Sequence, residues 1–575
     1  MVERLLRVFN REWSGLHEAA FLLAGTALLS QILGLARDRL LAHHFGAGQV
    51  LDIYYAAFRI PDFLYASVAS FVAVTVLIPF LLQRLEGDEP SKQSAEKNKK
   101  SEEVRLEGVK EFVNSVFTVF IFAMLAISIV VYFLIPLLGH RVVPGFTDGA
   151  FGEYVVLTRI LLLSPLLLGI SNLYGSVTQS LRRFFVFAAG PVLYNLGIII
   201  GIVFLLPRYG LSGVVWGVVL GAILHLSIQL PVLFSEKIVP RLTLHIDWRA
   251  IKSVMFLSVP RTIALSATQL ATIILVQFAS QIGIGSIAVF TLAMNLQSIP
   301  LAIVGMSYSV AAFPTLAKLW TGGNKPQFAA QIIVATRHIM FWSFPAIVLF
   351  IVLRAQIVRS ILGSGAFDWT ATRLTAAALA LFAISVVAQN LVLLFTRSFY
   401  AMGKTKLPLI GNVIGGVLVV LFSWILLFTY DTHPVFRYFA ETLLRVGDMN
   451  GTKILMLPLG YSLGMITNVL ILLYFLRQQF PDIIAGLKRA FLHSFTTSVV
   501  MGFVAYHSLQ AFALILDINT FLGIFTQGFV SGLIGVFAGV FLLRLMENEE
   551  LKEIWGSLHR KFWKQKPIAT EPEII

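Results

Sequence analysis

The sequence predicts an all-α polytopic membrane protein with about 14 transmembrane helices: two pseudo-symmetric six-helix lobes around a central cavity, then two C-terminal helices. Three observations support this fold class. Of the 575 residues, 57% are hydrophobic and 13% are charged, whereas soluble domains contain roughly 25% charged residues. Apolar windows of about 20 residues, long enough to span a bilayer as helices, recur along almost the whole chain. The windows are continuously apolar and lack the alternation of a membrane barrel.

The first six windows form the predicted N-lobe, residues 1–235. Backbone groups in lipid must bond to one another, so each window is expected to be a helix. In chain order the windows are 20–44, 50–82, 111–137, 151–177, 186–206 and 211–234. A polar segment of mixed charge, residues 84–110, separates the second window from the third. We expect this segment to be a mobile cytoplasmic loop, because it is poor in apolar residues.

The next six windows form the predicted C-lobe, residues 236–478, and two more occupy residues 479–545. The C-lobe windows are 253–280, 286–312, 331–360, 371–396, 407–430 and 452–476. Helices 13 and 14 are expected at 485–507 and 519–544, followed by a cytoplasmic tail at 546–575.

Matching motifs indicate that the two lobes are repeats. Gly46-Ala47-Gly48 precedes helix 2 and Gly283-Ile284-Gly285 precedes helix 8, and each helix contains a proline, Pro61 or Pro300. Helices 5 and 11 also match, with Pro191 and Asn195 in one and Pro408 and Asn412 in the other. Six spans return the chain to the same side of the membrane, so the repeats are parallel and are expected to hold a substrate site between them. We interpret Pro61, Pro300, Gly415 and Gly416 as kinks that permit the lobes to rock.

Lys and Arg are concentrated in alternate loops, and this alternation predicts the topology. The basic loops are cytoplasmic by the positive-inside rule, which places both termini in the cytoplasm and agrees with an even number of spans. The net charge of +14 is therefore a topology signal, with some attraction for anionic lipid headgroups. No nucleic-acid partner is expected.

Several kinds of chemistry are not predicted. No cleavable signal peptide is expected, because no small-residue cleavage pattern follows the first apolar window. The chain has no cysteine, which excludes disulfides, thiolate metal sites and cysteine nucleophiles. His43-His44 lacks an evident third ligand, so no metal site is predicted. We find no Gly-x4-Gly-Lys-[Ser/Thr] run for ATP, no cofactor motif and no catalytic constellation, so we expect no enzyme.

Charged residues inside two of the apolar windows indicate a polar site. Helix 1 contains Arg37 and Asp38, and helix 2 contains Asp52, Arg59 and Asp62. A charge within a spanning helix costs at least ~2.5–3.5 kcal/mol and usually faces a cavity or a partner. The arrangement is typical of a transporter. Alternatives for these residues are a structural Arg37–Asp38 ion pair and a helix-capping role for Asp52 at the start of helix 2.

The residues resemble the MurJ/MviN family, the lipid II flippases of bacterial cell-wall synthesis, within the multidrug/oligosaccharidyl-lipid/polysaccharide exporter superfamily. The resemblance spans most of the chain in the right order, and that family also has 14 helices. It rests on Gly34-Leu35-Ala36-Arg37-Asp38, Phe45-Gly46-Ala47-Gly48, Asp52, Ala57-Phe58-Arg59-Ile60-Pro61, Pro260-Arg261-Thr262, Phe313-Pro314-Thr315-Leu316 and Phe399-Tyr400-Ala401-Met402-Gly403-Lys404-Thr405-Lys406.

The resemblance implies a substrate-binding cavity, with some departures from the family pattern. Arg37, Asp38 and Asp52 match the pattern. Positions where the family often has Arg or an acidic residue hold other residues here, namely Gln31, Tyr65, Ser70 and Asn295. Arg59 and Arg261 are expected to replace part of the missing charge, although Arg261 also fits a side chain that snorkels to the cytoplasmic face. The predicted substrate-binding set is Arg37, Asp38, Asp52, Arg59, Arg261, Asn295 and Gln31.

The predicted function is a flippase that moves a lipid-linked peptidoglycan precursor from the inner to the outer leaflet of the bacterial plasma membrane by alternating access. Expected partners are the lipid-linked sugar diphosphate, membrane lipids and possible cell-wall synthesis enzymes. A flippase for another polysaccharide lipid or a MATE-like antiporter is the first alternative, although an antiporter favours acidic cavity residues and Arg predominates here. A transport-inactive membrane scaffold for cell-wall enzymes is the second.

The topology is testable by cysteine scanning, because the chain has no cysteine of its own. Single cysteines in the 431–451 loop should react with a membrane-impermeant maleimide in intact cells. Single cysteines in the 87–108 loop should react only after the membrane is opened, because that loop carries the basic excess of the cytoplasmic side. Labelling of residues 87–108 in intact cells would overturn the topology.

Overall fold

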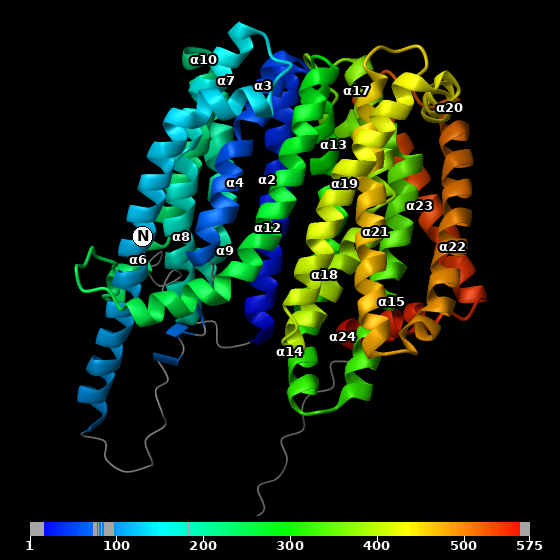
Figure 1. The fold of residues 1–575 in the computed structure, drawn as a ribbon. Coiled ribbons are helices and arrows are strands. Elements are labelled where there is room, and N and C mark those ends of the chain that lie inside the picture. Colours follow the sequence, from blue (N-terminus) through cyan, green and yellow to red (C-terminus); the bar gives the residue numbers. More distant parts are fainter. Residues whose placement is uncertain are drawn as a thin grey trace, which may run out of the picture. The chain divides into compact units, whose positions relative to one another are not determined.

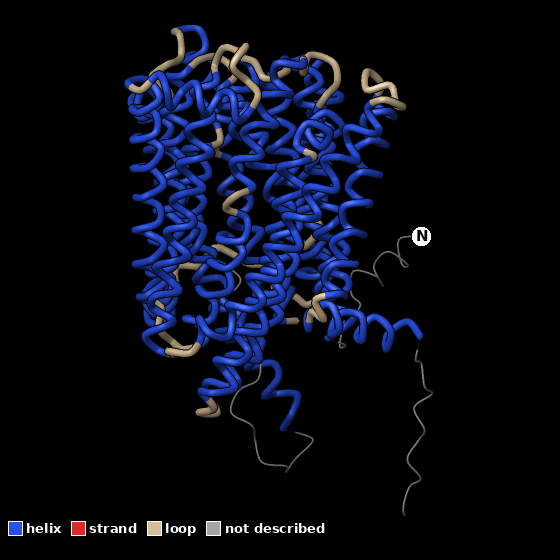
Figure 2. Tube along the Cα trace, turned by 90° about the vertical axis from the view of Figure 1, so that its right-hand side faces the viewer, coloured by secondary structure: helices blue, strands red, loops and turns tan. Residues whose placement is uncertain are grey.

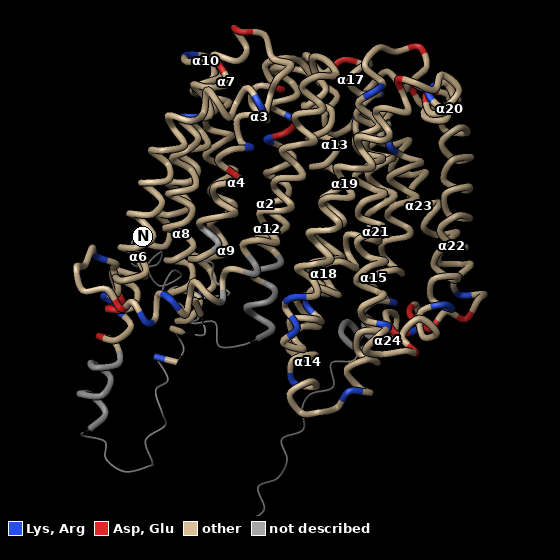
Figure 3. The backbone as a smooth tube through the Cα atoms, viewed as in Figure 1, with Lys and Arg blue, Asp and Glu red and all other residues tan. Residues whose placement is uncertain are grey.

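The structure is a computed structural model that describes residues 16–72, 77–78, 80–81, 83–84, 97–181 and 183–563. Every regular element within these ranges is helical and none is a strand (Figures 1 and 2). Along the helices, Lys, Arg, Asp and Glu gather near the ends and are sparse between them (Figure 3). The predicted all-α membrane fold is confirmed.

In the described part of the chain, the helices follow one another in this order. Up to residue 282 they are α2 (Leu16–Phe45), α3 (Gln49–Ala57), α4 (Arg59–Val68), α6 (Lys97–Val142), α7 (Asp148–Leu161), α8 (Leu163–Ser180), α9 (Phe184–Ile200), α10 (Leu206–Ser227), α11 (Leu230–Ser235) and α12 (Trp248–Ile282). They continue with α13 (Ser286–Pro300), α14 (Ser307–Thr321), α15 (Lys325–Val352), α16 (Arg354–Leu362), α17 (Trp369–Ala383), α18 (Val386–Ala401), α19 (Lys406–Thr432), α20 (Pro434–Leu444), α21 (Met456–Gln479), α22 (Ile483–Ala513), α23 (Phe521–Leu545) and α24 (Glu549–Trp563). Short 3₁₀ segments are η1 (Ala69–Val72) and η4 (Thr452–Leu455), and π-helical segments are η2 (Gly201–Leu205) and η3 (Leu301–Met306).

Among the described residues, nine helical runs are long and apolar enough to cross a membrane, or ten if the bent pair α17–α18 forms one span. One of these runs, Phe184–Ser235, contains two predicted spans, because the backbone of α10 is non-helical at Gly210 (φ 58°). Predicted spans 1, 2 and 13 fall on α2, α3–α4 and α22. The helices are consistent with 14 spans, and that number stays a prediction.

The chain divides into two compact units. Unit 1 comprises Met1–Leu296, Ile361–Ala378 and Leu409–Gly464, and unit 2 comprises Gln297–Ser360, Leu379–Pro408 and Met465–Ile575. The core of unit 1 includes Leu77, Phe112 and Leu173, and that of unit 2 includes Leu316, Phe328 and Phe399. The lobe boundaries at residues 235 and 478 stay a prediction.

The predicted mobile loop 84–110 needs a correction at its C-terminal end, where α6 begins at Lys97. Residues 85–96 lie outside the described part of the chain. From Leu106 onward the apolar residues recur at helical spacing, and Val109 and Val113 are buried in the core of unit 1. The helix therefore begins well before residue 111, because its apolar face already packs against the core of unit 1 at Val109.

The predicted kinks have different outcomes. Pro61 lies in the first turn of α4, just after a break at Phe58 that separates α3 from α4. Pro300 ends α13 and the π-helical segment η3 follows at once. A proline removes a backbone donor and disturbs the preceding turn. At Pro300 the helical run nevertheless continues to Thr321, with a π-helical pattern in place of a break. Gly415 and Gly416, in contrast, lie inside the continuous helix α19, where no break occurs.

A stripe of glycines brings α9 and α10 into close contact in unit 1. Gly197 meets Gly221 and Gly201 meets Gly217, so the two helices run antiparallel as a hairpin. A Cβ built on Gly217 would lie 2.5 Å from the Cα of Gly201. Small residues let helix backbones approach closely in membranes, where van der Waals contact replaces the hydrophobic driving force. The stripe therefore fixes α9, which also packs against α2.

Gly217→Ala should lower the stability of the protein, because its new methyl group overlaps the backbone at Gly201, where α9 passes into η2. We expect a loss of about 1–3 kcal/mol, as for other overpacked sites. The matched control is Gly152→Ala in α7, where a Cβ meets nothing within 4 Å. That control should be neutral or stabilising by ~0.4–1 kcal/mol. Thermal unfolding of the purified protein measures both, and equal midpoints would disprove the close contact.

Candidate functional site

Arg37 and Asp38 form an ion pair on α2 within unit 1. Nε and Nη2 of Arg37 donate to Oδ1 of Asp38 at 3.0 and 2.8 Å. Asp38 is buried, whereas the Arg37 side chain keeps 23% of its surface exposed. The carboxylate is therefore neutralised inside the protein, while the Arg37 side chain stays partly exposed.

Two asparagines from other helices complete this arrangement. Asn195 of α9 accepts from Nη1 of Arg37 at 3.2 Å, and Asn295 of α13 donates to Oδ2 of Asp38 at 3.0 Å. Asn195 is itself held by its amide nitrogen, which donates to the carbonyl and hydroxyl of Ser30 and to the carbonyl of Pro191. The guanidinium is thus held by direct partners on α2 and α9, and its partner Asp38 is held in turn from α13.

Part of the donor set of Arg37 is left for a ligand. The three hydrogen bonds of its guanidinium do not use all of its N–H groups. Because a guanidinium is planar and stays charged, a fixed and partly exposed one suits bidentate binding of a phosphate or carboxylate. The network of Arg37, Asp38, Asn195 and Asn295 is our candidate site.

Arg59 lies at the start of α4 and is buried in the same unit. Its Nη2 donates to the hydroxyl of Thr291 on α13 at 3.3 Å, and its Nε has no partner among the described residues. Asp62 follows one turn later on the same helix. A buried cation with an unpaired donor is costly, since leaving one polar group unpaired costs about 1–3 kcal/mol. Arg59 is accordingly a second position with donor capacity to spare.

Asp52 caps a helix, but not the one that the sequence suggests. The two interpretations from the sequence are substrate binding and a cap at the start of helix 2. The carboxylate of Asp52 accepts from the backbone N–H of Gly285 at 2.6 Å and of Ala288 at 2.7 Å, at the start of α13. It therefore caps helix 8, and the predicted cap of helix 2 is wrong. Both carboxylate oxygens are engaged, and the positive end of the helix dipole favours the negative charge. A substrate contact for Asp52 stays a prediction without support from this geometry.

The cap depends on a tight turn before α13. Gly285 has φ 86°, and a Cβ on it would overlap the carbonyl oxygen of Ala47. The turn that precedes α3 is similar, because Gly46 has φ 62° and a Cβ there would lie 2.6 Å from the carbonyl oxygen of Ala366. Glycine is needed at both positions for conformation and for space.

The remaining predicted residues are not brought into the network. Gln31 lies six residues before Arg37 in α2, is half-buried and makes no hydrogen bond to a described residue. The backbone of Arg261 belongs to α12, and its side chain lies outside the described residues. Tyr65, where the family often has Arg, accepts a hydrogen bond from Asn172 of α8 at 2.7 Å. The side chain of Ser70 also lies outside the described residues.

Two hydrogen-bond partners of the predicted residues lie outside the predicted substrate-binding set, namely Asn195, which bonds to Arg37, and Thr291, which bonds to Arg59. The sequence marks Asn195 only as part of a repeat and does not single out Thr291. A signal existed for Asn195, because an amide in the apolar window 186–206 needs a hydrogen-bond partner in the membrane. Thr291 gave no such signal, since a threonine in a helix can bond to its own backbone.

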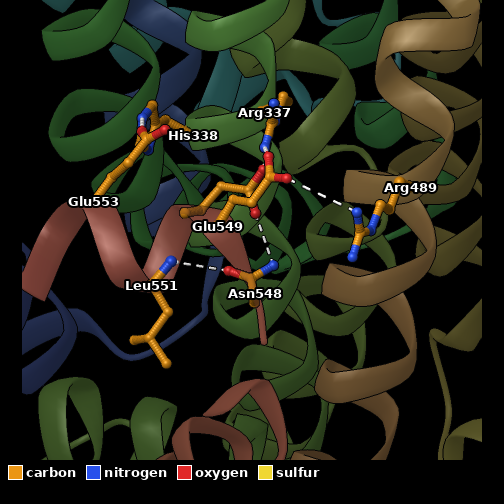
Figure 4. Close-up of polar contacts among 8 residues, drawn as sticks. Arg337, His338, Arg489, Asn548, Glu549, Leu551 and Glu553 are labelled. Atoms are coloured by element: carbon orange, nitrogen blue, oxygen red, sulfur yellow. Dashed lines mark hydrogen bonds and ion pairs between the residues drawn. The ribbon is translucent and has the colours of Figure 1, made fainter. Parts of the chain in front are cut away.

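A second charged cluster joins α24 to α15 in unit 2 (Figure 4). Nε and Nη2 of Arg337 donate to Glu550 and Glu549 at 2.5 Å each, and His338 pairs with Glu553 at 3.0 Å. The hydrogen bond from Arg337 lowers the pKa of Glu549, which keeps that carboxylate ionised. These charges are paired with one another, so the cluster attaches α24 to the helix bundle.

Asn548 caps the same helix and a small pocket adjoins it. The side-chain oxygen of Asn548 accepts from the backbone N–H of Leu551 at 2.9 Å (Figure 4). The pocket has a volume of about 140 Å³ and is lined by Arg337, Gly486, Arg489, Ala490, His493, Glu549 and Glu550. Among the described residues, no group of three or more His, Asp or Glu side chains is placed to hold a metal ion.

Comparison with known proteins identifies relatives along most of the chain. The family model described as "Lipid II flippase MurJ" matches residues 41–527. The "Lipid II flippase MurJ" of Burkholderia cenocepacia is 28% identical over 413 residues, which cover 70% of this chain and 77% of that protein. The "Probable lipid II flippase MurJ" of Rickettsia prowazekii is 24% identical over 505 residues, covering 86% of this chain and 91% of that protein.

Solved structures show the same fold. One described as "Lipid II flippase MurJ, inward closed conformation" has a TM-score of 0.69 and 21% identity, covering 92% of this chain and 100% of the other. An inward-facing multidrug resistance transporter of the MATE family has a TM-score of 0.61 and 14% identity, covering 81% of this chain and 99% of the other. At such identities the likeness concerns the fold.

Asp52→Ala should destabilise the protein, because it leaves two backbone N–H groups unpaired at the start of α13. At about 1–3 kcal/mol for each unpaired group, the expected loss is roughly 2–6 kcal/mol. Asp52→Asn should lose less, since asparagine is also a good N-cap. Asp148→Ala is the control, because Asp148 is exposed at the start of α7. Substitutions at exposed sites usually change the free energy of unfolding by no more than about 0.5 kcal/mol. Thermal unfolding would refute the cap if Asp52→Ala matched the control.

Proposed function

This chain belongs to the lipid II flippase MurJ family, and on that premise we propose that it moves a lipid-linked peptidoglycan precursor of the lipid II type from the inner to the outer leaflet of the bacterial plasma membrane. The family is one of transporters, and the apolar helices and bacterial relatives make this chain a multi-pass bacterial membrane protein. The observation that carries the proposal is the guanidinium of Arg37, which is held by Asp38 and Asn195 and keeps N–H groups that the protein does not use.

The chemistry of such a substrate explains why a fixed arginine is useful. Its head is a polar sugar diphosphate that must cross ~30 Å of hydrocarbon, while its apolar tail can stay in lipid. A guanidinium binds phosphate oxygens bidentately at any physiological pH. Asp38 and Asn195 hold the guanidinium of Arg37 in place before the ligand arrives, which lowers the entropy that binding must overcome.

The other candidate residues extend the proposed site. Arg59 supplies a second buried cation, and Asn295 orients Asp38. We place Gln31 and Arg261 in the site by the family resemblance alone. The proposed cycle is alternating access, with both chain termini in the cytoplasm and with cell-wall synthesis enzymes as candidate protein partners.

Because the sequence has no ATP-binding motif, we propose that a gradient or the supply of substrate drives transport. A cytoplasm-negative potential assists the outward movement of an anion by ~2.3 kcal/mol per charge per 100 mV. Two uncompensated phosphate charges would therefore gain roughly twice that energy.

The alternative function is a MATE-like antiporter, because a transporter of that family has a similar fold. Cation exchange needs a carboxylate that is free to bind and release its ligand. In the candidate site, Asp38 is bonded to both Arg37 and Asn295, and Asp52 caps α13. These two carboxylates are therefore not free for cation exchange, which supports an anionic substrate at Arg37.

Arg37→Ala should abolish or severely reduce flipping, and Arg37→Lys should recover only part of it, because lysine keeps the charge but lacks the planar fork. Loss of a charged hydrogen-bonding partner typically costs ~1.5–3 kcal/mol, roughly a tenfold to hundredfold effect. The measurement is the accessibility of lipid-linked precursor at the outer face in a flippase-depleted bacterium, normalised to folded protein in the membrane.

Two controls separate binding from a purely structural ion pair. Arg141→Ala, at an exposed arginine near the end of α6, should flip normally. If the pair were only structural, Arg37→Ala would lower the amount of folded protein, and the further change Asp38→Ala would restore it. Normal flipping by Arg37→Ala at normal abundance would remove Arg37 from the proposed mechanism.

A further inference from the structure

The helix α20 occupies a segment that the sequence indicated only as a loop, residues 431–451. Its polar face is bonded to the ends of two neighbouring elements in unit 1. Glu441 accepts hydrogen bonds from Tyr430 of α19 at 2.6 Å and from Thr452 of η4 at 2.7 Å. Arg437 donates to the same carboxylate at 3.1 Å. These bonds fix both the position of α20 and its rotation about its own axis.

The carboxylate of Glu441 keeps its charge in this arrangement. Burial acts to raise its pKa, but the hydrogen bonds from Tyr430, Thr452 and Arg437 outweigh burial and hold the pKa below its ordinary value. The attachment is thus present at neutral pH.

The opposite face of α20 is a stripe of exposed apolar side chains. Val435, Tyr438, Phe439 and Leu443 are 82%, 73%, 61% and 65% exposed. They recur at spacings of three and four residues, so they lie on one side of the helix. We call these four residues the apolar stripe. The polar face of α20 is bonded to α19 and η4, so the apolar stripe on the opposite face points away from these two elements.

The connections of α20 place it at the boundary of the membrane. The spanning helix α19 ends at Thr432, and only His433 separates it from α20. On the other side, η4 leads directly into α21. Figure 1 shows α20 beside the ends of α19 and α21 instead of continuing either of them. A helix so close to the end of a span lies at the depth of the lipid headgroups.

We propose that α20 is an interfacial helix whose apolar stripe inserts into the boundary between headgroups and acyl chains of the adjacent leaflet. Amphipathic helices bury such faces ~5–10 Å deep in this region. Tyr438 and Phe439 supply aromatic rings, which are enriched at membrane interfaces. Arg437 and Arg445 lie at the polar side and the end of the helix, where anionic headgroups attract basic side chains. By the predicted topology this leaflet is the outer one.

Spin labels on single cysteines test the depth of the stripe. The full chain, which has no native cysteine, is prepared as Phe439→Cys and as Asn450→Cys, labelled and reconstituted in bilayers of phosphatidylglycerol and phosphatidylethanolamine. Oxygen partitions into lipid, whereas a nickel chelate stays in water. The ratio of oxygen to nickel accessibility should be several-fold higher at residue 439 than at residue 450, an exposed position in the loop after α20.

Further variants guard against local disruption. Val435→Cys repeats the measurement at a second position of the stripe and should give the same result. Adding Leu443→Glu to Phe439→Cys should lower the ratio at residue 439 toward that at residue 450, because a carboxylate resists insertion. Nickel accessibility at residue 439 equal to that at residue 450 would overturn the proposal. Shielding of residue 439 from both oxygen and the nickel chelate would also overturn the proposal. In that case, spin–spin broadening that disappears on dilution with unlabelled protein would show that a second copy of the chain covers the stripe.

Discussion

Asp38 is a carboxylate buried in a membrane-spanning helix, and the arrangement around it follows from the need to neutralise that charge. An uncompensated buried charge costs about 3–5 kcal/mol. Arg37 supplies the opposite charge from the next position in the chain, and Asn295 supplies a neutral donor from α13. Meeting this requirement also fixes the guanidinium of Arg37, so the hydrogen bonds that stabilise the bundle also hold the group to which we assign anion binding.

The glycine stripe between α9 and α10 contributes to the same site from a distance. Asn195 reaches Arg37 only because α9 packs against α2, and the close approach at Gly197 and Gly201 holds α9 against α10 on its other side. A rigid hairpin behind Asn195 limits how far its amide can move. The packing of glycines between α9 and α10 thereby helps to orient the Asn195 amide, which bonds to Arg37 of α2.

The sequence was informative where a physical constraint acts on single residues, and less so where partners are distant in the chain. Charge in an apolar window marked Arg37 and Asp38, and the continuous apolar runs marked the helices. The partners of Asp52 lie more than 230 residues away at Gly285 and Ala288, so spacing within one helix suggested a cap of the wrong helix. Similarly, α20 is too short for its amphipathic pattern to stand out beside the long spans.

The cap that Asp52 places on α13 bears on the energetics of any cycle that separates the start of α13 from α3. Such a step must give up two hydrogen bonds to a charged acceptor, each worth about 1.5–3 kcal/mol. A bias of roughly 3–6 kcal/mol amounts to about two to four decades in the ratio of two conformations. In such a cycle, one carboxylate at a helix end would favour the conformation seen here, and a substrate would have to bind the other conformation more tightly by a similar factor to reverse that preference.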